Sequence, residues 1–575
     1  FVISSPDWDA MAGAVTWSDG TLGVSGVVTA INSLVGELPF DLVGAGGITV
    51  LPDSDFVVSS PDWDGSAGAA TWGDGGTGVS GVVSASNSLV GSSPFDQVSS
   101  GGITVLSNDN YVVSSPYWDH GSAFDVGAVT WGSGITGVAG LVSASNSLVG
   151  GSPYDYLAGF GETGVAALTN GNYVVLSPLW NNGSIVDAGA ATWGNGLGGT
   201  TGTPSSSNSF VGSQDYDHVS MQGVTLLNNG NYVVLSTSWR SGAGAASWGN
   251  GAGGSNGVVS DGNSLVGFSP GDQIGSEGVT ALTNGNYVVA SSSWDNGSAF
   301  DTGAVTWGDG TIGVRGPVTH SNSLVGHMPR ARVGSGGVTA LGNGNYVVAS
   351  PDWYFVDTSG GPPWRETYGS VTWANGTGGV AGPISASNSL WGGPFSTGQG
   401  VGRFGSEGVT PLANGNYVVG THWRAHWFDG FVNTVGRVSL NYFITSAPVR
   451  FAALPNGNYL ILSISSVTWA NGTSAIIGTP SSSKSLIQNK LGDELASGGV
   501  VTLNNGDYVV SSPKWGHVAS TDEGAVTWGS GTSGVQGTLG PSNSLIGNSP
   551  QDQAGSGGVF PLPGGRYAVH SPLWD

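Results

Sequence analysis

The chain has 575 residues, of which 103 are glycine and none is cysteine, and its formal net charge is −24. The lack of cysteine excludes disulfides and thiolate chemistry, and only 13 Lys and Arg argue against phosphate binding through clustered positive charge. A total of 22 Trp, 17 Phe and 16 Tyr supplies more core than a disordered chain has. The same scarcity of positive charge leads us to expect no nucleic-acid partner. No apolar run reaches the length of about 18 residues that a transmembrane helix needs, so no transmembrane segment is expected.

An aromatic residue that opens a short apolar strand recurs along the whole chain. Successive positions lie between 42 residues (Tyr417 to Tyr459) and 71 residues (Tyr346 to Tyr417) apart. This spacing is too long for leucine-rich or ankyrin repeats and suits a unit of four strands. We therefore predict a single array of about ten repeats over residues 1–575, with this aromatic at Phe1, Phe56, Tyr111, Tyr173, Tyr232, Tyr287, Tyr346, Tyr417, Tyr459, Tyr508 and Tyr567.

Each repeat carries four short strand signals, and the copy that starts at Val333 illustrates them. Its segments 337–341, 345–350, 370–373 and 387–391 are rich in Val, Thr, Leu and aromatic residues that alternate roughly with period two. Turn dipeptides such as Asn343-Gly344 and Ser350-Pro351 separate them, and Asn-Gly favours hairpins because both residues tolerate positive φ. No segment shows helical periodicity with caps, so the predicted class is all-β.

Two tryptophans and one asparagine recur at fixed positions of the repeat. We predict that the tryptophans pack between neighbouring repeats, because a residue present in every unit is more often core than ligand site. The asparagine of the recurring Asn-Ser-Leu is expected to bond the backbone of a turn. The pairs are Trp8 and Trp17, Trp63 and Trp72, Trp118 and Trp131, Trp180 and Trp193, Trp239 and Trp248, Trp294 and Trp307, Trp353 and Trp373, and Trp515 and Trp528, and the asparagines are Asn32, Asn87, Asn146, Asn208, Asn263, Asn322, Asn388 and Asn543.

The copies over residues 346–507 are irregular and form the first candidate site. Segment 354–365 is inserted between the second and third strands, segment 421–429 replaces the usual Ser-Pro-x-Trp loop, and seven of the 13 Lys and Arg lie from Arg330 to Arg450. Aromatic side chains near Arg and His can stack on a sugar, so Trp364, Trp423 and Trp427 are candidates for glycan contact. Two alternatives stay open: these aromatics fill gaps in a degenerate repeat, or this face contacts another subunit.

A second candidate is a loop that carries two acidic residues six positions apart. It runs over residues 119–125 and 295–301, with residues 181–187 as a relative. Two carboxylates with loop carbonyls could hold Ca²⁺. The alternative is a turn in which the first Asp bonds the loop backbone, and no residue is assigned as a metal ligand.

The repeat resembles the FG-GAP repeat of integrin-α-type β-propellers. The Phe-Gly step of that family occurs at Phe404-Gly405 and Phe160-Gly161 and is relaxed to Val43-Gly44, Ile274-Gly275 and Val333-Gly334. Ser-Ser-Pro at residues 59–61, 114–116 and 511–513 stands for its Gly-Ala-Pro, and residues 189–193 stand for its third strand. The family's calcium loop, Asp-x-Asp-x-Asp-Gly, does not occur. A looser resemblance links the repeats to long bacterial exoproteins described as filamentous-haemagglutinin-like.

The FG-GAP resemblance implies a β-propeller of about ten four-stranded antiparallel blades. Ten exceeds the usual single-ring count of about eight, so a large closed ring and an open spiral or tube of blades both remain possible. Residues 1–9 match residues 567–575, so both ends have the same phase, which we interpret as a processed chain or a segment of a longer one.

No unique catalytic constellation is found: the sequence has no Gly-x-Ser-x-Gly elbow, phosphate loop or His/Glu metal spacing. We therefore expect no enzyme and no catalytic or cofactor-binding residue. The expected function is that of an extracellular or cell-surface structural or adhesive protein that associates with itself or with other surface proteins, as a filament or surface layer. The alternative is a lectin-like propeller that binds glycans through residues 346–507.

Overall fold

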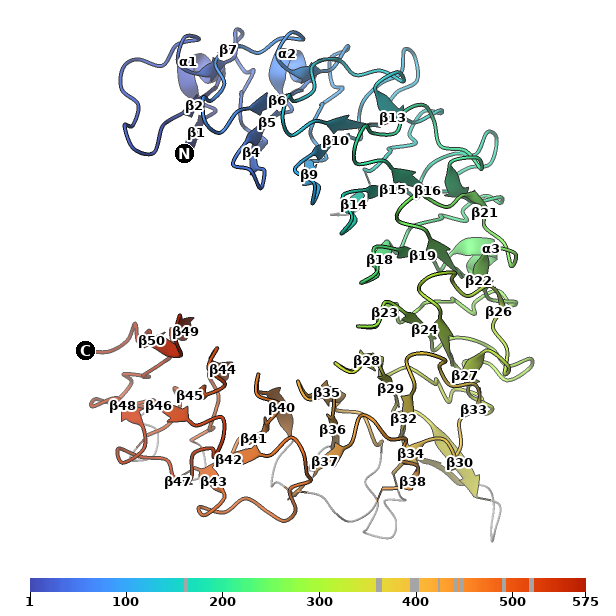
Figure 1. Ribbon diagram of the computed structural model, residues 1–575, viewed down its shortest axis with the longest axis vertical. Coiled ribbons are helices and arrows are strands. Elements are labelled where there is room, and N and C mark those ends of the chain that lie inside the picture. The colour runs from blue at the N-terminus through green and yellow to red at the C-terminus, as the bar shows by residue number, and fades with distance from the viewer. Residues whose placement is uncertain are drawn as a thin grey trace. The chain divides into compact units, whose positions relative to one another are not determined.

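The computed structural model describes residues 1–159, 164–357, 364–392, 403–421, 424–438, 443–444, 449–488, 493–516 and 522–575. It divides into two compact units, Phe1–Val279 with Asp309–Val318, and Thr280–Gly308 with Thr319–Asp575. Each unit is a series of small sheets that follow one another in chain order (Figure 1). The all-β prediction is confirmed. The described helices are three turns of four residues each, α1 (Trp8–Met11), α2 (Trp63–Ser66) and α3 (Trp239–Gly242).

The first unit holds sheets in which neighbouring strands are bonded in the order written. They are β1 (Val2–Ser5), β2 (Ala14–Trp17), β3 (Leu34–Val35), β7 (Gly81–Val82); β4 (Gly47–Val50), β5 (Phe56–Ser60), β6 (Ala69–Gly73), β8 (Leu89–Val90), β12 (Gly140–Leu141); β9 (Ile103–Val105), β10 (Tyr111–Ser115), β11 (Ala128–Gly132), β13 (Ser147–Val149); β14 (Val165–Ala167), β15 (Tyr173–Ser177), β16 (Ala190–Gly194), β17 (Ser209–Val211), β21 (Gly257–Val258); and β18 (Val224–Leu226), β19 (Tyr232–Ser236), β20 (Ala245–Gly249), β22 (Ser264–Val266), β26 (Gly316–Pro317).

The second unit repeats this plan. Its first strand begins at Val279, which is the last residue of the segment Phe1–Val279 of the first unit. Its sheets are β23 (Val279–Ala281), β24 (Tyr287–Ser291), β25 (Ala304–Gly308), β27 (Ser323–Val325), β33 (Gly382–Pro383); β28 (Val338–Ala340), β29 (Tyr346–Ser350), β32 (Ser370–Ala374), β34 (Leu390–Trp391), β38 (Gly436–Arg437); β30 (Tyr354–Asp357), β31 (Trp364–Thr367); β35 (Val409–Pro411), β36 (Tyr417–Thr421), β37 (Arg424–Phe428), β39 (Phe443–Ile444); β40 (Arg450–Ala453), β41 (Tyr459–Ser463), β42 (Ser466–Ala470), β43 (Ser485–Ile487), β47 (Gly537–Thr538); β44 (Val500–Thr502), β45 (Tyr508–Ser512), β46 (Ala525–Gly529), β48 (Leu545–Ile546); and β49 (Val559–Leu562), β50 (Arg566–Val569).

The strands match the prediction except at the end of the repeat. In the copy that starts at Val333, three strands lie where expected, whereas the fourth shortens to β34. The sequence did not predict the fifth strand, which the following repeat donates in parallel to the fourth: Leu34 pairs with Gly81, and Val35 with Val82. Successive sheets of a unit are therefore linked through the backbone as well as through their cores.

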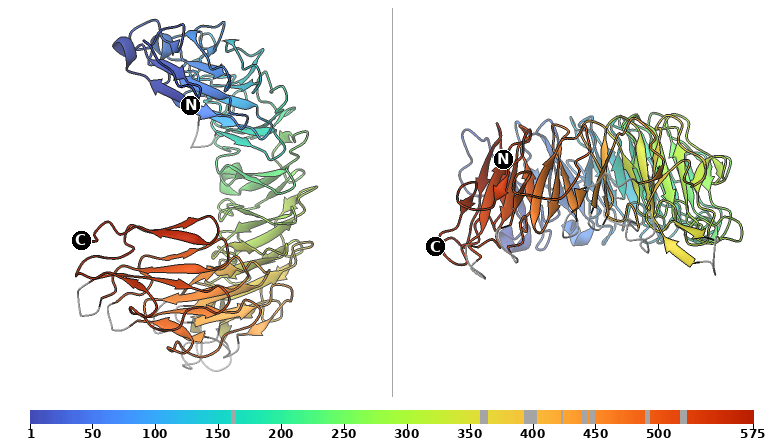
Figure 2. Two further views of the ribbon diagram at one scale, coloured as in Figure 1. Left: turned by 60° about the vertical axis from the view of Figure 1, so that its left-hand side comes forward. Right: turned by 90° about the horizontal axis from the view of Figure 1, so that it is seen from below.

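The second strand of each repeat is buried on both faces because a sheet packs against each side of it. In β5, Phe56 and Val58 enter a cluster with Val15 of the preceding repeat, whereas Val57 enters a cluster with Tyr111 of the following one. Side chains alternate across a strand, so an unbroken apolar run can serve two neighbours at once. Figure 2 shows the sheets of each unit stacked in this way.

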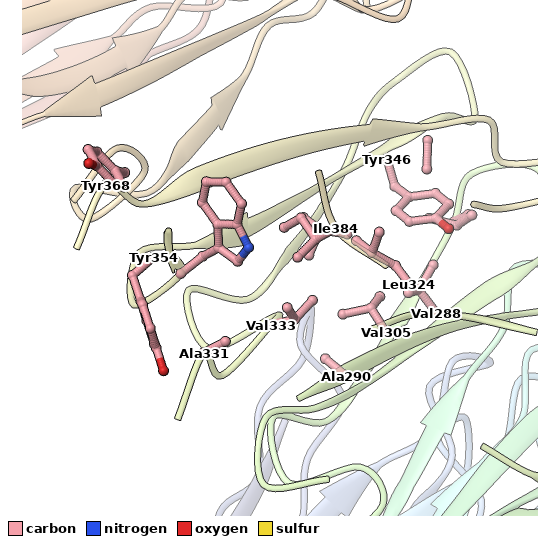
Figure 3. Packing of buried hydrophobic residues seen from close by; sticks show 14 residues of the cluster. Val288, Ala290, Val305, Leu324, Ala331, Val333, Tyr346, Tyr354, Tyr368 and Ile384 are labelled. Carbon is pink, nitrogen blue, oxygen red and sulfur yellow. The ribbon is translucent and has the colours of Figure 1, made fainter. Parts of the chain in front are cut away.

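A cluster of the second unit shows how such a joint is filled. Val288, Ala290 and Val305 of one sheet face Tyr346 and Ile384, which belong to the next repeat (Figure 3). All five side chains are at most 2% exposed, which places the core of the unit between the sheets.

Candidate functional site

The third-strand tryptophan fastens each repeat to the next. The indole Nε1 of Trp131 donates to the carbonyl oxygen of Gly196 at 2.9 Å, and the side-chain amides of Asn108 and Asn110 donate to the same oxygen, also at 2.9 Å each. The Trp-to-Gly bond recurs at 2.8–3.0 Å in every described repeat that has a successor of this type: Trp17 to Gly75, Trp72 to Gly134, Trp193 to Gly251, Trp248 to Gly310, Trp307 to Gly376, Trp373 to Gly430, Trp427 to Gly472 and Trp469 to Gly531.

The loop that supplies this carbonyl also covers the indole. Gly199 has φ +77°, and a Cβ at this position would lie 2.8 Å from Cβ of Trp131, so only glycine fits here. The predicted packing between repeats is confirmed for the third-strand tryptophans that make this bond, whereas Trp528 is 46% exposed. The asparagines of the Asn-x-Asn turn have a second role that the turn chemistry did not reveal, which is to bond the next repeat.

The other recurring asparagine behaves as predicted. Oδ1 of Asn87 accepts from the backbone of Ser84 at 2.9 Å, and its Nδ2 donates to the carbonyl of Val82 at 3.0 Å. This side chain therefore closes a turn within its own repeat and is no ligand site.

A buried aspartate forms a second joint that sequence reasoning missed. Oδ2 of Asp96 accepts from the backbone of Ser92 and Ser93 at 2.7 and 2.9 Å, and Oδ1 accepts from the backbone of Asp119 in the next repeat at 3.0 Å. Burial raises the pKa of this carboxyl, which is fully buried. The joint could have been predicted from the sequence, because the same aspartate recurs at Asp41, Asp155, Asp217, Asp272, Asp493 and Asp552.

One repeat has lost this aspartate and shows a replacement contact. Ala331 occupies the register of the aspartate and is buried. In the following repeat, the residue after the first tryptophan is Tyr354, whose hydroxyl donates to the carbonyl of Pro329 at 2.7 Å. The first part of the predicted insertion 354–365 thus contributes to a joint.

The candidate calcium loops are closed by their own first side chain. Oδ1 of Asp119 accepts from the backbone of Asp125 at 2.8 Å, and Oδ1 of Asp295 accepts from Asp301 in the same way. In the related loop, Oδ1 of Asn181 accepts from Asp187 at 3.0 Å, so a neutral amide serves equally well. This favours the alternative of an Asp-closed turn. Within the described ranges, no three His, Asp or Glu side chains gather in a metal-binding arrangement.

Of the three tryptophans proposed for glycan contact, the structure describes the side chain of Trp427. Trp427 is used in the joint to Gly472, which supports the core-packing alternative for this residue. Trp364 begins β31, which pairs with β30, and its side chain lies outside the described part of the chain. Trp423 also lies outside the described residues.

The irregular region does contain a pocket, and the pocket lies at a connection of only two residues, as short as the one between β36 and β37. In a regular repeat, residues 61–68 connect β5 to β6, whereas Ile464 and Ser465 alone connect β41 to β42. A pocket of about 420 Å³ opens beside this turn. It is lined by Arg450, Leu462, Ser463, Ile464, Glu494, Leu495, Ala496, Ser497, Gly499 and Lys514. The irregular spacing of the repeats pointed to this region, but the sequence did not single out these pocket residues.

A row of exposed aromatics in the first unit was also missed. The residue before the buried aspartate is Phe40, Phe95, Tyr154 or Tyr216 in four repeats, and its side chain is 55–69% exposed. Each has φ between 62° and 72°, a left-handed conformation that bulky residues rarely adopt. Strained backbone combined with exposed rings is more typical of a binding surface than of a packed core.

The comparisons with known proteins identify a family of repeats. The family described as "Repeat of unknown function (DUF5650)" matches residues 1–45, 50–100, 105–159, 167–221, 226–276, 281–335, 340–402, 453–497 and 502–556. No curated protein matches the chain. Similar solved structures include a protein of unknown function from Bacteroides caccae (14% identity, 52% of this chain and 89% of that chain, TM-score 0.21), a eukaryotic initiation factor (9%, 75% and 85%, 0.31) and Hsv2p from Kluyveromyces lactis (11%, 65% and 95%, 0.26).

Proposed function

We propose that the chain, which belongs to the DUF5650 family of repeats of unknown function, is a non-enzymatic structural or adhesive scaffold of the cell exterior. The observation that carries this proposal is the recurring joint. The residues that repeat most regularly, namely tryptophan, the Asn-x-Asn pair, glycine and the buried aspartate, are used to fasten one repeat to the next. A molecule whose recurring residues serve cohesion is suited to carrying load or presenting a surface.

The proposal extends to how the repeats are arranged in the scaffold. Each repeat would be a blade of an FG-GAP-like β-propeller, in a large ring or in an open spiral that continues into further copies or other surface proteins. The short antiparallel sheets and their face-to-face packing support blades. Among the described residues, no helix has the length and apolarity needed to cross a membrane.

Electron microscopy of the purified native protein tests the scaffold. Filaments or sheets are expected, with a repeat distance that matches successive repeats. Isolated particles at every concentration, without attachment to cells or surfaces, would contradict the proposal.

Glycan binding is the second candidate, and the exposed aromatic row favours it. Rings of Phe40, Phe95, Tyr154 and Tyr216 offer flat apolar faces at one register of the first unit. Replacing all four with glycine should abolish binding on a glycan array while leaving the fold intact, because glycine tolerates the left-handed backbone at these positions. Replacing Leu22 and Ile135, which are exposed in another loop of the repeat, with serine is the control. Unchanged array binding in the glycine variant would remove this candidate.

A further inference from the structure

The pocket beside Ser463 lies where the long loop between the second and third strands is missing. In the regular repeat, the backbone of Gln97 and Val98 donates to the carbonyls of Ser66 and Ala67 in the long loop. In the short repeat, Leu495 stands at the register of Val98 and donates instead to the carbonyl of Ile464 in the two-residue turn, at 2.9 Å. The rest of the long loop has no counterpart, so the surfaces of Leu462, Leu495 and Ala496 line an opening.

An arginine enters the same pocket at a position that is otherwise glycine. Arg450 pairs with Leu462 at the start of the repeat's first strand. The strand pairing places a glycine at this register in every other repeat: Gly47, Gly102, Gly164, Gly223, Gly278, Gly337, Gly408, Gly499 and Gly558. The short repeat therefore combines a lost loop with a gained guanidinium, and both changes face one cavity.

The charge of the pocket is opposite in sign to that of the chain. Lys514 and Glu494 form an ion pair with a distance of 2.6 Å between Nζ and Oε2. Within the described part of the chain, Arg450 has no acidic partner. Among its described lining residues, the pocket therefore has two basic side chains and one acidic side chain, in a protein whose net charge is −24. Its remaining walls are mostly apolar, with the hydroxyls of Ser463 and Ser497 among them.

We propose that this pocket binds a small organic carboxylate with an apolar body, such as an aryl or short-chain carboxylic acid. The guanidinium of Arg450 would bind the carboxylate through two parallel N–H bonds, a geometry that arginine matches and lysine does not. Leu462, Ile464 and Leu495 would contact the apolar body. The volume of about 420 Å³ lies within the range of small-molecule sites, which combine apolar walls with few polar groups. This site is independent of the scaffold and of the aromatic row.

Titration with 2-naphthoate, followed by calorimetry and by the fluorescence of the naphthyl group, tests the site, and 2-naphthalenemethanol serves as the uncharged analogue. The full chain should bind the carboxylate saturably below about 1 mM, and at least about tenfold more tightly than the alcohol because only the carboxylate pairs with the guanidinium. Arg450→Gly should remove this preference. It introduces the residue that nine repeats carry at this register, so the fold should be retained, as circular dichroism and the melting temperature would show.

A second variant changes affinity in the opposite direction. Glu494→Gln frees Lys514 from its ion pair and raises the charge of the pocket, so it should tighten carboxylate binding by about threefold. Absence of saturable binding to the full chain overturns the proposal, as does equal binding of acid and alcohol. If Arg450→Gly fails to fold, two measurements still decide whether the pocket binds a carboxylate. They are the comparison of acid with alcohol on the unmodified chain and the response to Glu494→Gln.

Discussion

Nε1 of Trp131 lies 2.9 Å from the carbonyl oxygen of Gly196, which belongs to the following repeat. Because the two residues are 65 positions apart in the chain, the bond holds two repeats together rather than one turn. The side-chain amide of Asn110 donates to the same oxygen, so the carbonyl is a common acceptor at the joint.

Trp131→Phe should weaken the joint by about 1–2 kcal/mol, because the ring volume is largely kept while a half-buried hydrogen bond is lost. Repeat arrays unfold in parts, so the effect is best read from amide hydrogen exchange around residues 108–110 and 194–199. Trp528→Phe is the matched control, since Trp528 has the same register but is 46% exposed. Equal loss of protection in both variants would argue against the joint.

Asp55→Asn should stabilise the chain by about 1 kcal/mol. Asp55 occupies the register of Asn110 and keeps the acceptor role, because its Oδ1 accepts from the backbone of Gly75 at 2.7 Å. It lacks the amide that would donate to Gly134 in the next repeat, and burial raises the pKa of its carboxyl. Asparagine supplies the donor and removes a partly desolvated charge. The expected result is a higher melting temperature, with Glu37→Gln, on an exposed residue, as the control for loss of one negative charge.

Asp96→Ala should destabilise the surrounding repeats by about 2–4 kcal/mol, because three backbone N–H groups lose their acceptor in a buried site. Hydrogen exchange at Ser92, Ser93 and Asp119 should accelerate together. Asp62→Ala, at a half-buried aspartate of the same repeat, should leave these amides protected. If the three amides respond independently, the carboxylate does not act as their shared acceptor.

The stability of the second unit should depend on the protonation of His426. This residue stands in β37 at the register where other repeats place a buried threonine, and burial lowers the pKa of its imidazole to about 3, with the charge of Arg424 as the smaller cause. The unfolded chain takes up the proton near the ordinary value of 6.5, so the folded state loses stability as the pH falls from 6.5 toward 3.

His426→Thr removes this titration and restores the residue found at Thr372 and Thr468. Between pH 6.5 and 3, the free energy of unfolding of the unmodified chain should fall more steeply with falling pH than that of the variant, by at most about 1.4 kcal/mol per pH unit. Melting temperatures of both chains at pH 7, 5 and 4 test whether stability falls with falling pH. NMR signals of an imidazole that is already protonated at pH 5 in the folded chain would contradict it.

The sequence by itself determined the features that recur within one repeat. The apolar run of the second strand, the Asn-Gly turns and the spacing of the tryptophans are local and periodic, so they predicted the all-β class, three of the four strands and the packing of most tryptophans between repeats. The turn-closing role of Asn87 followed in the same way, because its partners Ser84 and Val82 lie within five residues of it.

Only the tertiary structure decided which groups meet across two repeats. Asp96 is one of 37 acidic residues, and its burial became visible once the next repeat had placed the backbone of Asp119 against it. The donated parallel strand, the shared carbonyl of Gly196 and the pocket of Arg450 have the same origin. Each of them depends on contacts between segments far apart in the chain, whereas periodicity and turn chemistry report only on neighbours within a strand or a turn.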